Sequence, residues 1–165
     1  MKGIFSVLVE NKAGVLSKTA GLFARRGFNI DSLAVGETDD RDISSMTIIS
    51  TGDERIMEQI EKQLAKLEDV IDIKKLQDGE SVCRELILVK IKINDTQRQA
   101  VLSVANIFRA KIVDVSNDSM VIELTGGQSK LDAFLDLLRG YDILELARTG
   151  ITGLSRGSSN VTIID

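Results

Sequence analysis

Residues 4–33 of the chain read IFSVLVENKAGVLSKTAGLFARRGFNIDSL, and the order of the structural elements can be followed outward from them. Residues 4–9 form a short apolar and β-branched run, which predicts a strand. Residues 11–14 predict a turn, and the apolar residues after it recur at helical spacing. Gly27 lies where such a helix would end, and residues 28–35 predict a second strand. This stretch therefore predicts strand, turn, helix and strand in direct succession.

The next residues complete one structural unit. A polar hairpin is expected at residues 37–42, followed by a third strand at residues 43–50. Asp53 is a candidate N-cap. The helix after it has apolar residues at helical spacing, namely Ile56, Ile60, Leu64 and Leu67. Residues 70–76 alternate apolar and polar side chains and predict a closing strand, so the order is that of the split βαβ, or ferredoxin-like, arrangement.

The same order begins again after a polar linker at residues 78–81. Four further strands are expected at residues 86–93, 111–115, 120–125 and 143–147. Two helical stripes lie between them, Val101, Val104, Ala105 and Phe108, and then Leu131, Phe134, Leu135 and Leu138. We therefore predict an α+β protein with two tandem ferredoxin-like βαββαβ domains, residues 1–78 and residues 79–165. The glycine- and serine-rich tail from Gly153 is either loose or an added edge strand.

The composition excludes several kinds of chemistry. The 165 residues include no histidine, so Ser-His-Asp catalysis, Cys-His catalysis and histidine-bearing zinc sites are impossible. The single cysteine, Cys83, cannot form an intrachain disulfide, which suits the cytoplasm, and we interpret it as a small core residue. The formal net charge of −4 disfavours nucleic acid, and no apolar run is long enough to span a membrane. We expect a cytoplasmic protein that is not an enzyme in its own right.

Two polar clusters are weak candidates for binding. The hairpin holds Glu37, Asp39, Asp40 and Asp42, but it lacks the glycine and the final glutamate of an EF-hand loop. A solvated hairpin is therefore favoured, and no metal site is expected. Residues 126–130, GGQSK, could offer helix amides to a phosphate, but they are not a Walker A loop. An ordinary helix start is favoured there.

The first turn has the residue types of a carboxylate site. Residues 11–16, NKAGVL, lead from a strand into a helix, whose unpaired N-terminal amides attract an anion. Gly14 would allow a ligand to approach the backbone closely, and Asn11 offers both a donor and an acceptor. Val15 and Leu16 supply an apolar wall, so an aliphatic amino acid matches the site in type. From these residues alone, an ordinary strand-to-helix turn is still the favoured interpretation.

A resemblance to a known family changes this balance. A strand, then Asn-x-x-Gly-Val-Leu, then a helix, within a βαββαβ unit, resembles an ACT domain. The likeness extends along the chain to the regulatory (small) subunit of acetolactate synthase, also called acetohydroxyacid synthase. The stretches that carry it are residues 22–33 (LFARRGFNIDSL), 46–48 (MTI), 58–67 (EQIEKQLAKL), 84–90 (RELILVK), 130–135 (KLDAFL) and 147–157 (ARTGITGLSRG). Together they are far more specific than the turn.

The resemblance implies a regulatory role in branched-chain amino acid biosynthesis. Members of this family have no catalytic site and activate a large subunit that uses thiamine diphosphate, Mg²⁺ and usually FAD. They also confer feedback inhibition, typically by valine. Their N-terminal ACT domains pair side by side into one sheet, and the effector binds between the two chains. For this chain, the resemblance therefore implies a homodimer, a large-subunit partner and no cofactor of its own.

The family motif carries over onto particular residues. Effector binding is expected at Asn11, Lys12, Ala13, Gly14, Val15, Leu16 and Ser17 of one chain, and at Asn29 and Ile30 of the other, at the start of the second strand. Contact with the large subunit is expected at Arg148, Thr149, Gly150, Gly153, Leu154, Ser155 and Arg156, with a solvated strand end as the alternative for this stretch. An alternative function is a stand-alone amino-acid sensor that controls another enzyme or transcription.

Overall fold

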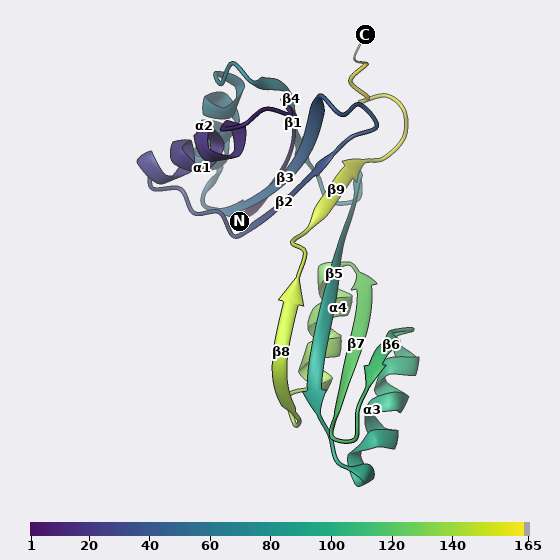
Figure 1. Cartoon of the computed structure of the whole chain (residues 1–165). Helices are drawn as coiled ribbons and strands as arrows, with labels where there is room; N and C mark the ends of the chain where they lie inside the picture. Colours follow the sequence, from purple (N-terminus) through teal and green to yellow (C-terminus); the bar gives the residue numbers. More distant parts are fainter. Residues whose placement is uncertain (164–165) are drawn as a thin grey trace. The chain divides into compact units, whose positions relative to one another are not determined.

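The computed structural model describes residues 1–163 (Figure 1). These residues fold into two compact units. The first comprises Met1–Cys83 together with the C-terminal residues from Ile151, and the second comprises Arg84–Gly150. Strands and helices follow the order βαββαβ twice along the chain, so the predicted α+β fold with two ferredoxin-like arrangements is confirmed. Among the described residues, no helix is both long enough and apolar enough to cross a membrane.

The first unit is an antiparallel sheet with two helices packed on one face (Figure 1). Its elements are β1 (Lys2–Glu10), α1 (Val15–Arg25), β2 (Ser32–Glu37), β3 (Ile43–Thr51), α2 (Glu54–Ala65) and β4 (Val70–Leu76). The order across the sheet is β2-β3-β1-β4, which leaves β2 and β4 at the edges. Both helices cover the same face because each has an apolar stripe that must be buried.

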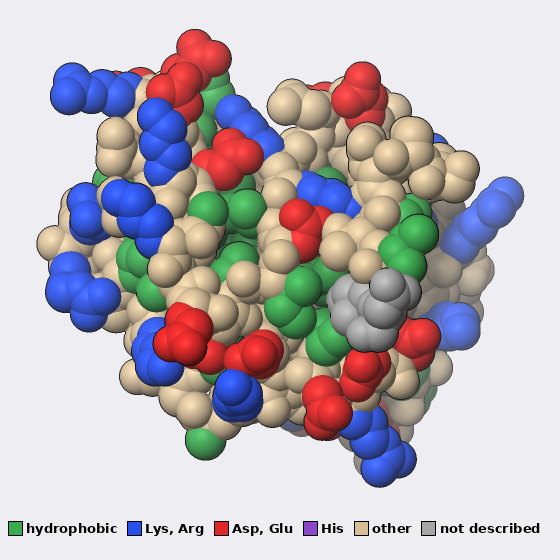
Figure 2. Space-filling view, turned by 90° about the horizontal axis from the view of Figure 1, so that it is seen from above, with side chains coloured by type: hydrophobic (Ala, Val, Ile, Leu, Met, Phe, Trp, Pro, Cys, Tyr) green, Lys and Arg blue, Asp and Glu red, His purple; other side chains and the backbone are tan. Residues whose placement is uncertain are grey.

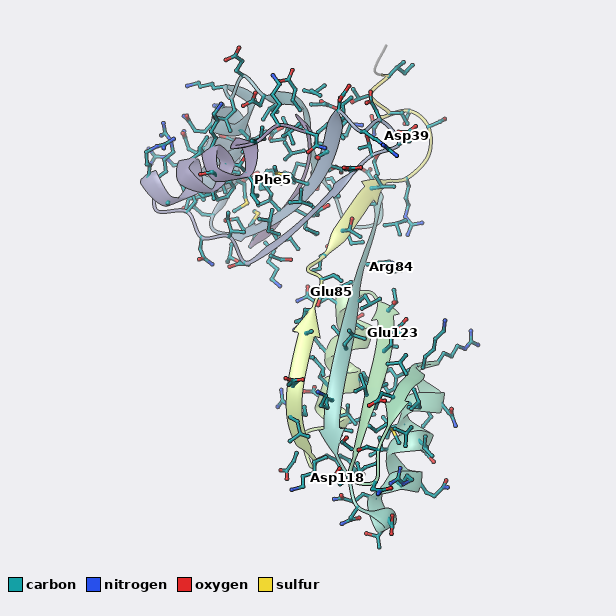
Figure 3. The ribbon with its side chains drawn as sticks, viewed as in Figure 1. Phe5, Asp39, Arg84, Glu85, Asp118 and Glu123 are labelled. Carbon is teal, nitrogen blue, oxygen red and sulfur yellow. The ribbon has the colours of Figure 1, made fainter. Side chains whose placement is uncertain are left out.

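Alternation along β1 builds the core of this unit. Phe5, Val7 and Val9 are buried and belong to one cluster with Phe23 of α1 and Ile60 of α2. Figure 3 shows the Phe5 side chain in the layer between the sheet and the helices. The residues between them on β1 are only partly buried, because they point to the opposite face of the sheet.

The ends of both helices follow local sequence signals. Asp53 caps α2, as predicted, because its side chain accepts a hydrogen bond from the Ile56 backbone N–H at 2.8 Å. Gly27 follows α1 with φ +70°, which a residue with a side chain adopts only at a cost. The Phe28 N–H then donates to the Phe23 carbonyl at 3.0 Å, and this closes the helix end.

The second unit repeats the plan. Its elements are β5 (Ser81–Lys92), α3 (Asp95–Ile107), β6 (Lys111–Val115), β7 (Ser119–Gly126), α4 (Gln128–Leu137) and β8 (Asp142–Arg148), in sheet order β6-β7-β5-β8. Ile87, Val89 and Ile91 point from β5 into its core. The stretch from Asn94 is a well-formed helix start, because Asn94 and Gln97 form a reciprocal capping box.

The C-terminal tail adds a strand. β9 (Thr152–Ser155) pairs with the beginning of β5 and belongs to the first unit. Of the two alternatives for the tail, the added strand is therefore correct for residues 152–155. This pairing also explains why β5 begins at Ser81, earlier than the strand expected at residues 86–93. Residues 164–165, at the end of the predicted tail, lie outside the described residues.

One boundary near the predicted site was wrong. We expected the second strand at residues 28–35, but β2 begins at Ser32. Residues 28–31 are instead occupied in closing α1 and in side-chain bonds: Asn29 Nδ2 donates to Asp31 Oδ1 at 2.6 Å. The apolar pattern does not predict this later start of β2, because Asn29 and Asp31 are held by hydrogen bonds from Ser50 and Thr51, near the end of β3.

Candidate functional site

The turn after β1 has the geometry of an open helix start. Gly14 is the N-cap of α1, with φ +89° and ψ −11°, and no side chain caps the helix there. A Cβ added to Gly14 would meet no atom within 4 Å. The first amide of α1, the Val15 N–H, donates to the Lys12 carbonyl at 3.4 Å. A helix start without a side-chain cap is the kind of position that attracts an anion.

Asn11 holds this turn against the neighbouring hairpin through two hydrogen bonds. Its side-chain Nδ2 donates to the Arg41 carbonyl at 2.8 Å, and its backbone N–H donates to the Asp42 carbonyl at 2.7 Å. The hairpin tip also holds Asp39, which Figure 3 labels. The polar residues at positions 37–42 thus position the turn through backbone carbonyls, and the predicted solvated hairpin has this structural role.

The turn carries both a charge and an apolar wall. Lys12 Nζ forms an ion pair with Glu10 at 2.6 Å, and the hydrogen bond and charge of Glu10 raise the pKa of Lys12. Val15 is buried and anchors the helix start, whereas the side chain of Leu16 is 47% exposed. Ala13 and Ser17 are exposed beside it. A small molecule with a carboxylate and an aliphatic side chain would therefore meet complementary groups here.

Asn29 and Ile30 lie at the other end of the same unit. Asn11 is bonded to Asp42, directly before β3, whereas the Asn29 carbonyl accepts from Ser50 Oγ at 2.6 Å, near the end of β3. At about 3.3 Å per strand residue, the distance from Asp42 to Ser50 along β3 is roughly 26 Å. Within one chain, the predicted residues of the turn and the pair Asn29–Ile30 are therefore not brought together.

A short network holds the Asn29 end in place. The Asp31 carboxylate accepts hydrogen bonds from Thr51 Oγ1 and from Asn29 Nδ2, and these bonds hold the pKa of Asp31 below its ordinary value of 3.8. The Asp31 backbone N–H donates to the Ile49 carbonyl at 2.7 Å. Asp31 was not among the predicted site residues, because its bond to Thr51 joins residues that are 20 positions apart in the sequence.

The predicted contact residues near the C-terminus differ in their environment. Arg148 forms an ion pair with Glu85, a buried carboxylate on β5 that is labelled in Figure 3. Thr149 accepts at its Oγ1 from the Leu86 N–H at 3.1 Å, and Gly150 has φ +84°. In the first unit, Gly153 is buried and Ser155 half-buried, whereas Leu154 and Arg156 are exposed. The predicted contact residues are therefore of two kinds. Arg148, Thr149 and Gly153 make contacts within the fold, whereas Leu154 and Arg156 face solvent.

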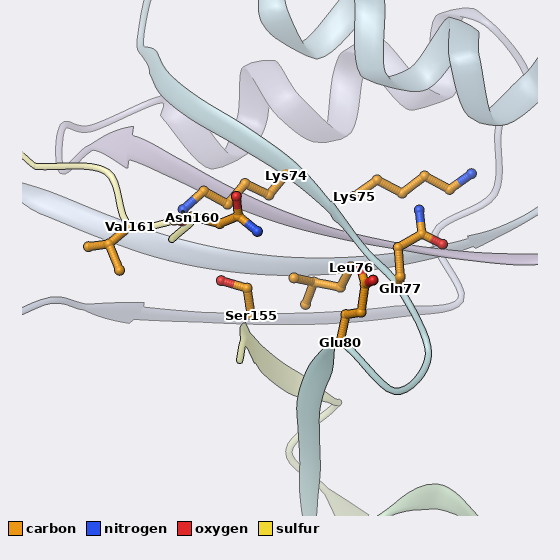
Figure 4. Close-up of a pocket in the computed structure, with 8 residues that line it drawn as sticks. All are labelled: Lys74, Lys75, Leu76, Gln77, Glu80, Ser155, Asn160 and Val161. Carbon is orange, nitrogen blue, oxygen red and sulfur yellow. Dashed lines mark hydrogen bonds between the residues drawn. The ribbon is translucent and has the colours of Figure 1, made fainter. Parts of the chain in front are cut away.

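A cavity lies elsewhere in the first unit. Its volume is about 410 Å³, and its lining combines β4 with the C-terminal tail (Figure 4). The lining residues are Lys74, Lys75, Leu76, Gln77, Glu80, Ser155, Asn160 and Val161. None of them was predicted to bind the effector. Among the described residues, no three or more acidic, cysteine or histidine side chains gather as a metal site would require.

One face of the molecule has mixed charge. Figure 2 shows acidic and basic side chains interspersed over one face, with apolar side chains reaching the surface between them. This mixture agrees with the modest formal net charge of −4. A face of this kind does not have the continuous positive potential that attracts nucleic acid.

Comparison with known families accounts for both halves of the chain. Residues 5–72 match a model described as the AHAS small subunit-like ACT domain, and residues 84–157 match one described as the small subunit of acetolactate synthase. A probable acetolactate synthase small subunit from Methanothermobacter thermautotrophicus is 53% identical, over 94% of this chain and 93% of that protein. The chain belongs to the acetolactate synthase small subunit family. The family resemblance and the ACT domain expected from the sequence are thereby confirmed.

Other members of the acetolactate synthase small subunit family are nearly as similar. The acetolactate synthase isozyme 3 small subunit of Escherichia coli is 49% identical over 95% of this chain and 97% of that protein. The crystal structure of the acetolactate synthase small subunit from Thermotoga maritima matches with a TM-score of 0.89 and 42% identity. The match covers 96% of this chain and 99% of that chain.

Proposed function

We propose that this small subunit activates the catalytic large subunit of acetolactate synthase and makes it sensitive to feedback inhibition by valine. Family membership along the whole chain supports the partner, and the ACT match at residues 5–72 supports an amino-acid effector. The observation that carries the effector site is the start of α1 at Gly14, where φ is +89°, no side chain caps the helix and open space surrounds the position of an added Cβ.

Each part of valine has a counterpart at this turn. The carboxylate would accept from the first amides of α1, close to the cationic Lys12 and beside Ala13 and Ser17. The isopropyl group would lie against the exposed side chain of Leu16, and Asn11 would hold the geometry through its bonds to the hairpin. The turn alone is half of a site, because its other walls are open.

Pairing of two copies through β2 would complete the site. On β2, Glu37 pairs with Ser44, at the end of the sheet that holds Asn11, and Ser32 pairs with Ile49, at the end that holds Asn29. If the two β2 edges align antiparallel about a two-fold axis, Asn29 and Ile30 of one copy approach the turn of the other. The same pairing would cover Val35, an exposed apolar residue on the free edge.

The small subunit itself would have no catalytic role. The absence of histidine excludes the common nucleophile and zinc chemistries, and the thiamine diphosphate, Mg²⁺ and FAD would be bound by the large subunit. Regulation would occur in the cytoplasm, as part of branched-chain amino acid biosynthesis. For contact with the large subunit we propose the stretch from Arg148 to Arg156, in which Leu154 is the most exposed apolar side chain.

Two measurements test this proposal. Calorimetric titration of the purified chain with valine, leucine and isoleucine should give saturable binding, at one site per turn, for at least valine. Reconstitution with the large subunit should raise its acetolactate synthase activity, and valine should lower the activity again. Absence of binding for all three amino acids would contradict the effector site. Full activation by a chain truncated after Leu146 would contradict the proposed contact stretch.

A further inference from the structure

The C-terminal segment has a built seat on the sheet of the first unit. We call residues 151–156 the strap, and the part of the sheet around Ser32 and Thr47 that holds it the seat. The Ile151 N–H donates to Ser32 Oγ at 3.0 Å, and the Gly153 N–H donates to Thr47 Oγ1 at 3.1 Å. Thr47 is only 2% exposed and lies between Met46 and Ile48, whose side chains belong to the core under the helices. The strap therefore lies on the face of the sheet that the helices leave uncovered.

The seat fits a strap without a side chain at position 153. A Cβ added to Gly153 would lie 2.8 Å from Cys83 Sγ and 2.9 Å from Leu76 Cδ1. Beyond β9, the Arg156 N–H donates to the Glu80 carbonyl at 2.8 Å. The strap is thus held by hydrogen bonds from three of its backbone N–H groups and by close packing at Gly153.

The two faces of the strap have different partners. Ile151 and Gly153 face the sheet and are buried. Thr152, Leu154 and Arg156 alternate with them and are exposed, and Leu154 is 70% exposed. An exposed apolar side chain beside a cation, on a strand that is rigidly held, is suited to dock into an apolar pocket with an acidic rim.

The seat is also continuous with the network that holds Asn29. Ser32 directly follows Asp31, whose carboxylate binds the Asn29 side chain at 2.6 Å. Ser50 Oγ holds the Asn29 carbonyl at 2.6 Å from the same end of β3. A shift of Asn29 would therefore move Asp31 and the residue after it, which bears the hydroxyl that holds the strap.

We propose that Ser32 and Thr47 are positioning residues that couple effector binding at Asn29 and Ile30 to the large subunit, by seating the strap that presents Leu154 and Arg156. This inference rests on the function proposed above for the effector and the partner. An effector shifts an equilibrium only by its differential affinity for two arrangements. We propose that the two arrangements differ in the position of the strap, which is set by the hydrogen bonds to Ser32 and Thr47. A change there would alter the surface that Leu154 and Arg156 offer to the large subunit.

The test uses Ser32→Ala and Thr47→Val in the reconstituted complex. Ser103→Ala is a matched control, because the Ser103 hydroxyl bonds within α3 of the other unit. For each chain, three quantities are measured: the valine Kd by calorimetry, activation without valine, and the valine concentration for half-inhibition. With the small subunit at saturating concentration, we expect a valine Kd within about twofold of the unaltered chain, maximal activation retained, and half-inhibition raised about fivefold or more. Thr47→Ser, which keeps the hydroxyl, should restore near-normal inhibition.

The outcomes separate this inference from the proposed function. If the unaltered complex is inhibited by valine and Ser32→Ala and Thr47→Val are inhibited equally, the coupling role is overturned and the proposed function stands. Loss of maximal activation at saturating small subunit, with unchanged inhibition of the remaining activity, would also overturn it, because the hydroxyls would then support docking alone. If valine does not inhibit the unaltered complex, the proposed function is wrong and the inference falls with it.

Discussion

Asn11 and Asn29 are held at opposite ends of the same β-strand. The backbone N–H of Asn11 donates to the carbonyl of Asp42, directly before β3, and the carbonyl of Asn29 accepts from Ser50, near the end of β3. A ligand that touches both residues must therefore touch two chains. The proposed effector site would therefore belong to the proposed dimer, and this allows sharper tests than substitution at a single site.

Gly14→Asp should remove feedback inhibition and keep activation. The new carboxylate would repel the ligand's carboxylate at the start of α1, and the backbone at φ +89° would add about 1–2 kcal/mol of strain. Gly79→Asp is the matched control, because Gly79 also has positive φ and open space around it. Inhibition curves of the reconstituted complex measure the effect. A normal valine response from Gly14→Asp would rule out the turn as the site.

Mixed dimers should reveal whether the site is shared between chains. Gly14→Asp and Asn29→His each alter both composite sites of a homodimer. In a mixed dimer of the two variants, one site contains both changes and the other contains none. Valine titration of differently tagged, co-purified chains should therefore recover about half of the normal binding stoichiometry. A site formed within one chain predicts no recovery at all.

Asp31 should make the stability of the chain depend on acid pH. Its bonds to Thr51 and Asn29 lower its pKa below 3.8 in the folded chain, so the unfolded chain binds the proton more readily. The stabilisation is fully present above about pH 3.8 and is lost as the pH falls through the lowered pKa. Asp31→Asn should flatten the fall in unfolding free energy on acidification. Equal slopes for Asp31→Asn and the unaltered chain would contradict the assignment.

Gly153→Ala should destabilise the first unit. Its methyl group would overlap Cys83 Sγ and Leu76 Cδ1, and overpacking of this kind costs about 1–3 kcal/mol. Gly36→Ala, where no atom lies within 4 Å of the added Cβ, is the control for a change of glycine in a strand. Denaturant unfolding of both variants provides the comparison. A smaller loss for Gly153→Ala than for Gly36→Ala would mean that the strap is not seated as described.

Leu154→Ala should weaken activation with little change in stability. The side chain is 70% exposed, so its removal should alter the unfolding free energy by less than about 0.5 kcal/mol. If Leu154 anchors the large subunit, the concentration of small subunit needed for half-maximal activation should be at least about fivefold higher for the variant. Leu137→Ala, at an exposed leucine of the second unit, is the control. Equal activation curves for the two variants would remove Leu154 from the contact.

Local patterns determined most of the element order. Alternation along β1, helical spacing in α1 and α2, Gly27 after α1 and the Asp53 cap all act between residues close in sequence, and their positions agree with the structure. The family resemblance came from local stretches as well, and it named the turn at Gly14. These features can be predicted from the sequence because the interactions that stabilise them are between residues close in sequence.

The tertiary structure decided what depends on distant partners. The register of β1 on β3 separates Asn11 from Asn29. The late start of β2 follows from bonds to Ser50 and Thr51. The strap is held by hydroxyl groups on β2 and β3. No periodicity marks a serine or threonine whose hydroxyl accepts from a backbone N–H more than a hundred residues away. By itself the sequence predicted a turn with the residue types of a carboxylate site. The pairing of strands decided that Asn11 and Asn29 lie at opposite ends of β3, so the proposed site that uses both needs a second chain.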